Sequence, residues 1–173
     1  MTQFRKILIK SLVKIAVYVE AKSSRIRDEF RNVYWGLRLK KFGEGSRVYG
    51  YVHVQGEHHI SIGKNCTLNE GVCIFAKERV QIGDYVRISP KVLIITHGLN
   101  FDNCDPPYKH YSAPITIEEG VWIASKAVIT AGVTIGRHSI VAAGSIVTHS
   151  VEPYTIVGGI PAKYLRSVKR QVE

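Results

Sequence analysis

The sequence predicts an all-β protein built as a parallel β-helix, a coil of short strands, from two repeating positions. Large aliphatic residues recur every six positions along most of the chain, at Ile62, Leu68, Ile74, Ile82, Ile88, Ile94, Ile117, Ile123, Ile129, Ile135, Val141 and Val147. One two-residue phase shift falls between Ile74 and Ile82. Four residues after each aliphatic residue comes a small or β-branched one, and only Glu78 breaks this second pattern.

A period of six fits neither an amphipathic helix nor a long alternating strand. It fits short strands joined by tight turns, in which three hexads complete one coil and successive coils stack about 4.8 Å apart. Glycines beside the aliphatic residue, or three positions after it, supply the positive φ that such turns need. An ordinary β-sandwich of short strands is the alternative, and it does not require so regular a spacing.

The charge of the chain lies at its two ends. The formal net charge is +10. Residues 1–47 hold twelve Lys and Arg against four Asp and Glu, residues 48–162 hold eight against nine, and residues 163–173 hold four against one. We therefore expect a basic helical segment over residues 1–42, a nearly neutral β-helix over residues 43–162 and a basic tail over residues 163–173.

The N-terminal segment reads as helical from Phe4 to about Lys41. Lys6, Lys10 and Lys14 share one face of its first part, while aliphatic residues occupy the others. The segment is too short and too charged to span a bilayer. Two interpretations follow: a cap on the open end of the coil or within an oligomer, which the need to close a solenoid favours, and an interfacial helix on an anionic membrane.

Composition also bears on compartment and partners. Three cysteines, Cys66, Cys73 and Cys104, cannot pair completely and show no metal-binding spacing. The apolar N-terminus is interrupted by lysines, which is not typical of a signal peptide. We expect a cytoplasmic protein. The basic ends lack interleaved stacking aromatics, so no nucleic-acid partner is expected.

Three segments resemble the hexapeptide-repeat acyltransferases: VWIASKAVITAGVTIG from Val121, VAAGSIVT from Val141, and VGGIPAKYLR from Val157. The resemblance covers about residues 62–166 and is greatest to the galactoside, maltose and polysaccharide O-acetyltransferases. It implies a left-handed coil, an exception to the usual right-handed crossover. It also implies a homotrimer that binds acetyl-CoA between neighbouring subunits.

The resemblance places a catalytic histidine at His97, where the hexads stop. A sugar hydroxyl attacks a thioester at neutral pH only if a base removes its proton, and neutral imidazole is available as that base. The tetrahedral oxyanion needs a fixed donor, and the resemblance implies a backbone N–H of the segment 122–125. Ala124 replaces the family's common glycine there, and we expect its N–H to remain available. His110 is the alternative base.

The gap in the hexads predicts an extruded loop over residues 98–114, and loops of this length are usually functional. Its Asn100, Asp102 and Tyr111 are suited to binding a sugar acceptor, although the loop could also clamp an oligomer. The resemblance adds Asn69 as an acceptor ligand, with a turn-stabilising role as the alternative. It also assigns acetyl-CoA contacts, which are expected at Ala124, Ser125, Ala143, Thr148, Lys163 and Arg166.

His53, His58 and His59 cluster before the first hexads. Carbonic anhydrases of the gamma class share the repeat and bind zinc with three histidines, two of them five residues apart. That spacing occurs here in the wrong coil, so we interpret these residues as surface or turn histidines and expect no metal.

Together these observations predict an acetyl-CoA-dependent O-acetyltransferase acting on a sugar or glycan intermediate of the surface polysaccharide or lipopolysaccharide type. An amine acceptor and a non-catalytic trimeric scaffold remain as alternatives. His97 and the intact segment PAK from Pro161 argue against the scaffold, which needs neither.

Overall fold

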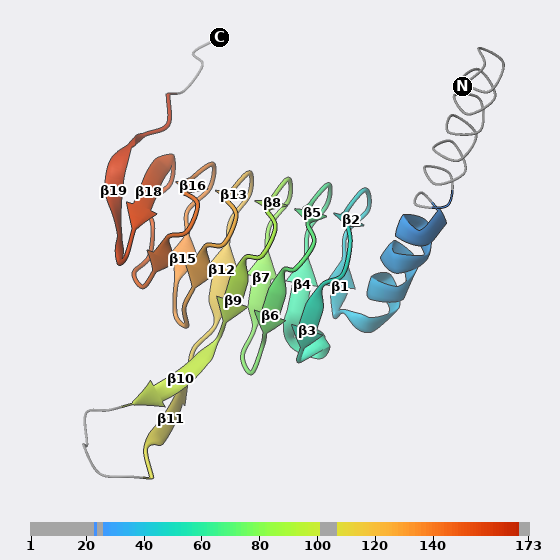
Figure 1. Cartoon of the computed structure of the whole chain (residues 1–173), viewed down its shortest axis with the longest axis horizontal. Coiled ribbons are helices and arrows are strands. Elements are labelled where there is room, and N and C mark those ends of the chain that lie inside the picture. Colours follow the sequence, from blue (N-terminus) through green and yellow to red (C-terminus); the bar gives the residue numbers. More distant parts are fainter. Residues whose placement is uncertain (1–22, 24–25, 101–106, 170–173) are drawn as a thin grey trace, which may run out of the picture.

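A computed structural model describes residues 23, 26–100 and 107–169. Within these residues the chain forms a helix over residues 26–38 and then a three-sided coil of short strands (Figure 1). Strands on one side of the coil pair with those on the same side of the next coil, which produces three parallel sheets. The parallel β-helix predicted from the hexads is therefore confirmed.

Each sheet forms one side of the coil. The first contains β1 (Lys41–Phe42), β4 (Ile60–Ile62), β7 (Val80–Ile82), β12 (Ile115–Ile117) and β15 (Thr134–Ile135). The second contains β2 (Arg47–Val48), β5 (Thr67–Leu68), β8 (Arg87–Ile88), β13 (Trp122–Ile123), β16 (Ile140–Val141), β18 (Thr155–Gly159) and β19 (Ala162–Ser167). The third contains β3 (His53–Gln55), β6 (Cys73–Phe75), β9 (Leu93–Ile95), β14 (Val128–Ile129) and β17 (Ile146–Val147).

The hexad positions form the core. All twelve aliphatic side chains point inward and are at most 2% exposed. The small residue four positions later fills the corner, as Val121, Ala127 and Val133 do with at most 1% exposure. Equivalent positions stack in register, with Ile62 on Ile82 and Ile123 on Val141. Burying each of these side chains contributes about 1.5–3 kcal/mol relative to exposure.

The coils differ in length, and the residues beyond three hexads always lie at the same edge of the coil. We call the turns from the first to the second sheet the first edge, those from the second to the third sheet the second edge, and those from the third back to the first sheet the third edge. The length of each coil is the sequence separation of residues that pair in neighbouring coils. It is 20 residues from Ser61 to Gln81, 35 from Gln81 to Thr116 and 18 from Thr116 to Thr134.

The surplus over 18 lies at the third edge in each long coil. In the first coil the 3₁₀ turn η1 (Glu57–His59) occupies this edge, and in the second coil residues 76–79 do so. In the third coil the chain leaves as an antiparallel arm, β10 (His97–Asn100) and β11 (Lys109–Ser112), which projects from the coil in Figure 1. The extruded loop predicted for residues 98–114 corresponds to this arm, and residues 101–106 lie outside the described residues.

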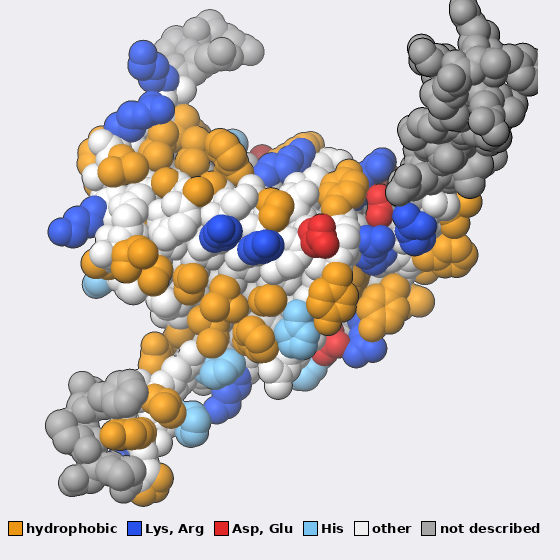
Figure 2. All heavy atoms as spheres, viewed as in Figure 1, with side chains coloured by type: hydrophobic (Ala, Val, Ile, Leu, Met, Phe, Trp, Pro, Cys, Tyr) orange, Lys and Arg blue, Asp and Glu red, His pale blue; other side chains and the backbone are white. Residues whose placement is uncertain are grey.

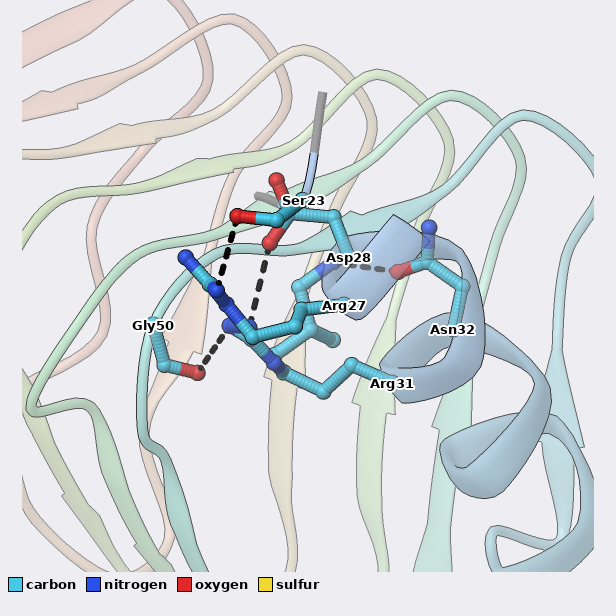
Figure 3. A network of polar contacts seen from close by, with 7 residues as sticks. Ser23, Arg27, Asp28, Arg31, Asn32 and Gly50 are labelled. Carbon is cyan, nitrogen blue, oxygen red and sulfur yellow. Dashed lines mark hydrogen bonds and ion pairs between the residues drawn. The ribbon is translucent and has the colours of Figure 1, made fainter. Parts of the chain in front are cut away.

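The helix closes the first coil. Trp35 and Leu39 are buried against the core, with exposures of 7% and 8%. Figure 3 shows the polar contacts: the Arg31 guanidinium donates to the Gly50 carbonyl at 2.9 Å, and the Asn32 Oδ1 accepts from the Val48 N–H at 2.8 Å. Most of the predicted helix before residue 26 lies outside the described residues. Within the described part of the chain, no helix has the length and hydropathy to cross a membrane.

The C-terminal end is a hairpin. Strand β19 runs antiparallel to β18, with Gly158 opposite Lys163 and Ile156 opposite Arg166. The segment expected as a basic tail from residue 163 thus begins inside a strand. Lys163 and Arg166 are exposed on this strand.

The buried thiol of Cys66 provides a test of the packed core. The side chain is fully buried, its Sγ donates to the Gly83 carbonyl at 3.0 Å, and burial raises the pKa of the thiol. In a variant that retains only this cysteine (Cys73→Ser with Cys104→Ser), we expect iodoacetamide at pH 8 to label the native protein far more slowly than the urea-unfolded protein. Equal labelling rates would contradict this packing.

The same shift has a pH consequence. The pKa of the Cys66 thiol is higher in the folded protein than in the unfolded chain. The contribution of this thiol to folding stability is therefore fully present below the unfolded pKa and is lost as pH rises through the folded pKa.

Candidate active site

The root of the arm is held by a buried hydroxyl. Thr96, the last residue before β10, is fully buried. Its Oγ1 accepts from the N–H groups of Lys77 and Glu78, at 2.9 and 3.0 Å, and donates to the Phe75 carbonyl at 3.2 Å. The chain returns at Ala113, whose N–H donates to the Thr96 carbonyl at 2.9 Å. These bonds fix the start of the arm on the lengthened turn of the coil before it.

His97 follows directly and faces a cavity at the third edge. Its side chain is half-buried. The cavity has a volume of about 430 Å³ and is lined by Gln55, Gly56, His58, His59, Phe75, Ala76, Lys77 and His97. Figure 2 shows histidine side chains gathered on the visible face between the helix and the arm. The lining residues come largely from the lengthened turns of the first two coils.

One ring nitrogen of His97 is buried without a partner. Within the described chain, its Nδ1 makes no hydrogen bond. Buried polar atoms in folded proteins nearly always have a partner, so this nitrogen is an exception. A histidine that lines a cavity and follows a fixed backbone position suits proton transfer there.

Glu78, which breaks the small-residue pattern, has a contact of its own in the arm. Ser112 lies opposite His97 in the β10–β11 register, and its Oγ donates to the Glu78 Oε1 at 2.9 Å. The half-buried carboxylate therefore holds the second strand of the arm instead of filling a core corner. The break in the small-residue pattern was a sequence signal for this contact.

The predicted acceptor residues of the arm lie at different distances from His97. The Tyr111 ring passes over Gly98, where a Cβ would lie 2.6 Å from Tyr111 Cε1, so a larger residue next to the base would displace this ring. Asn100 is three residues along β10, about 10 Å away at 3.3 Å per residue. His110 is exposed on β11. Asp102 lies outside the described residues.

A second group of predicted residues lies at the second edge, in the turns that follow β5, β13 and β16, namely Asn69, Ala124, Ser125 and Ala143. Asn69 serves the coil, because its Nδ2 donates to the Ile88 carbonyl at 2.8 Å. The expectation of an available N–H at Ala124 is wrong, since that group donates to the Val141 carbonyl at 2.9 Å. Among the described residues, the N–H of Ser125 has no acceptor.

In one chain the third sheet separates these two groups. Ser125 precedes β14 at the second edge, whereas His97 follows β9 at the third edge. Thr148 shares the third edge with His97, and its Oγ1 lies 3.0 Å from His149 Nδ1. Lys163 and Arg166 lie on β19 at the end of the second sheet. The predicted base and the predicted acetyl-CoA contacts are thus not all brought together within a single chain.

The N-terminal histidines are closer to the base than the sequence suggested. The rings of His58 and His59 lie 4.1 Å apart beside the His97 cavity, and His53 contacts Phe75. Among the described residues, no three His, Cys, Asp or Glu side chains are grouped so that they could hold a metal ion. Sequence reasoning missed Lys77, His58 and His59 as cavity residues, although the phase shift before Ile82 marked one of the lengthened turns that carry them.

A larger cavity, of about 620 Å³, lies between the helix and the first coil, lined in part by Arg31, Tyr34, Trp35 and Arg38. Its charged groups are already engaged: Arg31 bonds Gly50 and Asp28, and Arg38 pairs with Glu57. His53 is the one histidine in its lining. The smaller cavity, with the incompletely paired His97, is the better candidate.

Comparisons with known proteins agree with this fold. A family model described as bacterial transferase hexapeptide (six repeats) matches residues 114–149. Galactoside O-acetyltransferase of Escherichia coli K12 is 35% identical over 158 residues, which are 87% of this chain and 70% of that protein.

Two solved structures have the same coil. A hexapeptide-repeat acetyltransferase of Vibrio cholerae O1 biovar eltor, complexed with acetyl-CoA, is 34% identical and has a TM-score of 0.79, covering 94% of this chain and 90% of that chain. A maltose O-acetyltransferase of Clostridium difficile 630 is 26% identical, with a TM-score of 0.77 and coverage of 92% and 89%. With this fold and this identity across most of its length, the chain belongs to the hexapeptide-repeat acetyltransferases.

Proposed function

We propose that the protein transfers the acetyl group of acetyl-CoA to a hydroxyl of a sugar or glycan intermediate, with His97 as the base. The observation that carries this proposal is the placement of His97, which follows the fixed Thr96 at the root of the arm and lines the cavity. A hydroxyl in this cavity gives its proton to the imidazole as its oxygen attacks the thioester carbonyl carbon. The tetrahedral intermediate then collapses, the C–S bond breaks, and the imidazolium returns the proton to the CoA sulfur.

The oxyanion of that intermediate needs a donor that the coil has not already used. The Ser125 N–H is the candidate in its segment, because the neighbouring Ala124 N–H belongs to the coil. An N–H fixed in a tight turn stabilises developing charge without reorganisation. Since Ser125 lies at a different edge from His97, we place this donor on a neighbouring copy of the chain.

The surface of the third sheet supports such an assembly. From β6 to β17 its outward side chains are apolar and half-buried, namely Cys73, Phe75, Leu93, Ile95, Val128 and Ile146, whereas β3 presents the exposed His53 and Gln55. The outward side chains of the first sheet, in contrast, are polar, namely Lys41, Ser61, Gln81, Thr116 and Thr134. A continuous apolar face marks an interface. A closed homotrimer that covers this face would set the second edge of one copy against the third edge of the next.

Acetyl-CoA would follow the small residues of the later coils toward the C-terminal hairpin. Ser125 and Ala143 occupy successive turns of the second edge. The exposed Lys163 and Arg166 on β19 then supply positive charge for the nucleotide phosphates, Lys163 as a point charge and Arg166 as a bidentate fork. The free cysteines Cys66 and Cys73 suit a reducing compartment, which supports a cytoplasmic location.

Replacing the base is the direct test. We expect His97→Ala to lower acetyl transfer by about 10²- to 10⁴-fold, the usual contribution of general base catalysis. The Kd for acetyl-CoA, measured by calorimetry, should stay within about twofold because His97 acts on the acceptor hydroxyl. His138→Asn is the control, since His138 is exposed at the first edge and has a φ of 57° that asparagine tolerates. Wild-type turnover by His97→Ala would remove His97 as the base.

The contact between Ser112 and Glu78 is expected to position the base. Glu78→Ala and Ser112→Ala should each lower kcat several-fold with little change in the KM for acetyl-CoA, because losing the hydrogen bond loosens the arm at His97. In a His97→Ala background neither change should lower the residual rate further. A further loss in that background, without a change in Tm, would show that Glu78 acts independently of His97.

The phosphate assignment is tested with a CoA analogue. We expect Arg166→Gln to weaken acetyl-CoA binding by about tenfold, the value of one charge-assisted hydrogen bond. It should also reduce the discrimination between acetyl-CoA and its 3′-dephospho analogue, as measured by calorimetry. Arg137→Gln, at an exposed position of the first edge, is the matched control. Unchanged discrimination would place the 3′-phosphate elsewhere.

A further inference from the structure

The cavity in front of His97 has an unusual charge. Among the described residues, its lining contains one lysine and three histidines, at Lys77, His58, His59 and His97, and no acidic side chain. Sites that bind neutral sugars alone have no need of a fixed cation. The lining therefore carries a net positive charge whether or not the imidazoles are protonated.

The acidic groups nearest in sequence are occupied elsewhere. Glu57 precedes the two histidines, and its carboxylate pairs with Arg38 on the helix. Glu78 follows Lys77, and its carboxylate accepts from Ser112 of the arm. Neither glutamate lines the cavity. In the described part of the chain, no carboxylate forms an ion pair with Lys77.

The backbone of Lys77 is also held close to that of the base, and its exposed side chain lines the cavity. Its backbone N–H donates to Thr96 Oγ1, and Thr96 is the residue immediately before His97. The two residues lie on consecutive coils of the third edge, and coils stack about 4.8 Å apart. Phe75 contributes a half-buried ring to the same lining.

We propose that the acceptor carries an anionic group, a phosphate or a carboxylate, which Lys77 binds while His97 takes the proton of a nearby hydroxyl. The inference rests on the proposed function and names the substrate class of its acceptor site. The Lys77 ammonium group is a compact positive charge with three N–H donors, and it can bind either anion. A neutral sugar would leave this charge unpaired. The exposed His58 and the half-buried His59 supply additional donors at the far side of the cavity.

Matched acceptors test this class. Acetyl transfer from acetyl-CoA is followed by CoA release with three glucosides that differ in one group: methyl α-glucoside, α-glucose 1-phosphate and methyl α-glucuronide. The galactose and N-acetylglucosamine counterparts are measured in parallel. We expect the better anionic member of at least one series to exceed its neutral partner in kcat/KM by about tenfold or more, as one charge-assisted hydrogen bond supplies. The anionic sugar with the larger increase in kcat/KM identifies the anion of the acceptor as a phosphate or a carboxylate.

Three variants assign the preference to Lys77. Lys77→Met should abolish the advantage in kcat/KM of the anionic sugar over the neutral one. Lys77→Arg should retain much of it. Lys64→Met, at an exposed position of the first edge, should leave it unchanged. The advantage should also decrease with salt, because a partly exposed ion pair is screened. A preference that survives Lys77→Met, or equal use of neutral and anionic sugars, would overturn the inference.

Direct binding separates this inference from the proposed function. Dissociation constants for the same sugars are measured by saturation-transfer NMR in the presence of CoA, where no transfer occurs. Anionic sugars that bind in a Lys77-dependent way but receive no acetyl group would support the anionic site and refute the O-acetyl transfer. Neutral sugars that bind and are acetylated at least as well as anionic ones would support the O-acetyl transfer and refute the anionic site.

Discussion

The stacking of aliphatic side chains along the axis of the coil is the constraint on which the rest of the structure depends. Each inward residue must lie over its equivalent in the previous coil, as Ile62 does over Ile82. A coil therefore cannot absorb extra residues on its sides without moving a hexad position out of the core. Surplus residues have to leave at an edge, and within the described chain the three longest coils release them at the third edge. The site at His97 is a consequence of that choice.

The fold could be predicted because this stacking leaves a simple trace in sequence. Every hexad position must be aliphatic and every corner small, so the spacing alone predicted the coil and its core. The position of His97 at the root of an excursion was predictable for the same reason. The interruption of the hexads after Ile94 fixes where the chain leaves the coil.

Other parts of the site depend on contacts that spacing does not encode. The N–H of Ala124 faces the Val141 carbonyl one coil later, and only the three-dimensional register shows that this donor is already used. His58 and His59 come together with His97 because two lengthened turns stack on each other, although the residues are nearly forty positions apart. Glu78 was visible as an exception to the repeat, but its partner Ser112 lies across the arm and could not be deduced from local sequence.

The two kinds of coil divide the chemistry between them. The later coils, with paired residues 18 apart from Thr116 to Thr134, present regular edges, and the small residues proposed to contact acetyl-CoA lie on them. The earlier coils have lengthened turns, and the residues proposed to contact the acceptor lie there. Because these turns project outside the stacked core, residues such as Lys77 can change without altering a hexad position. Acceptor preference is therefore expected to depend on the turns of the third edge, where a side chain can change without disturbing the packed core.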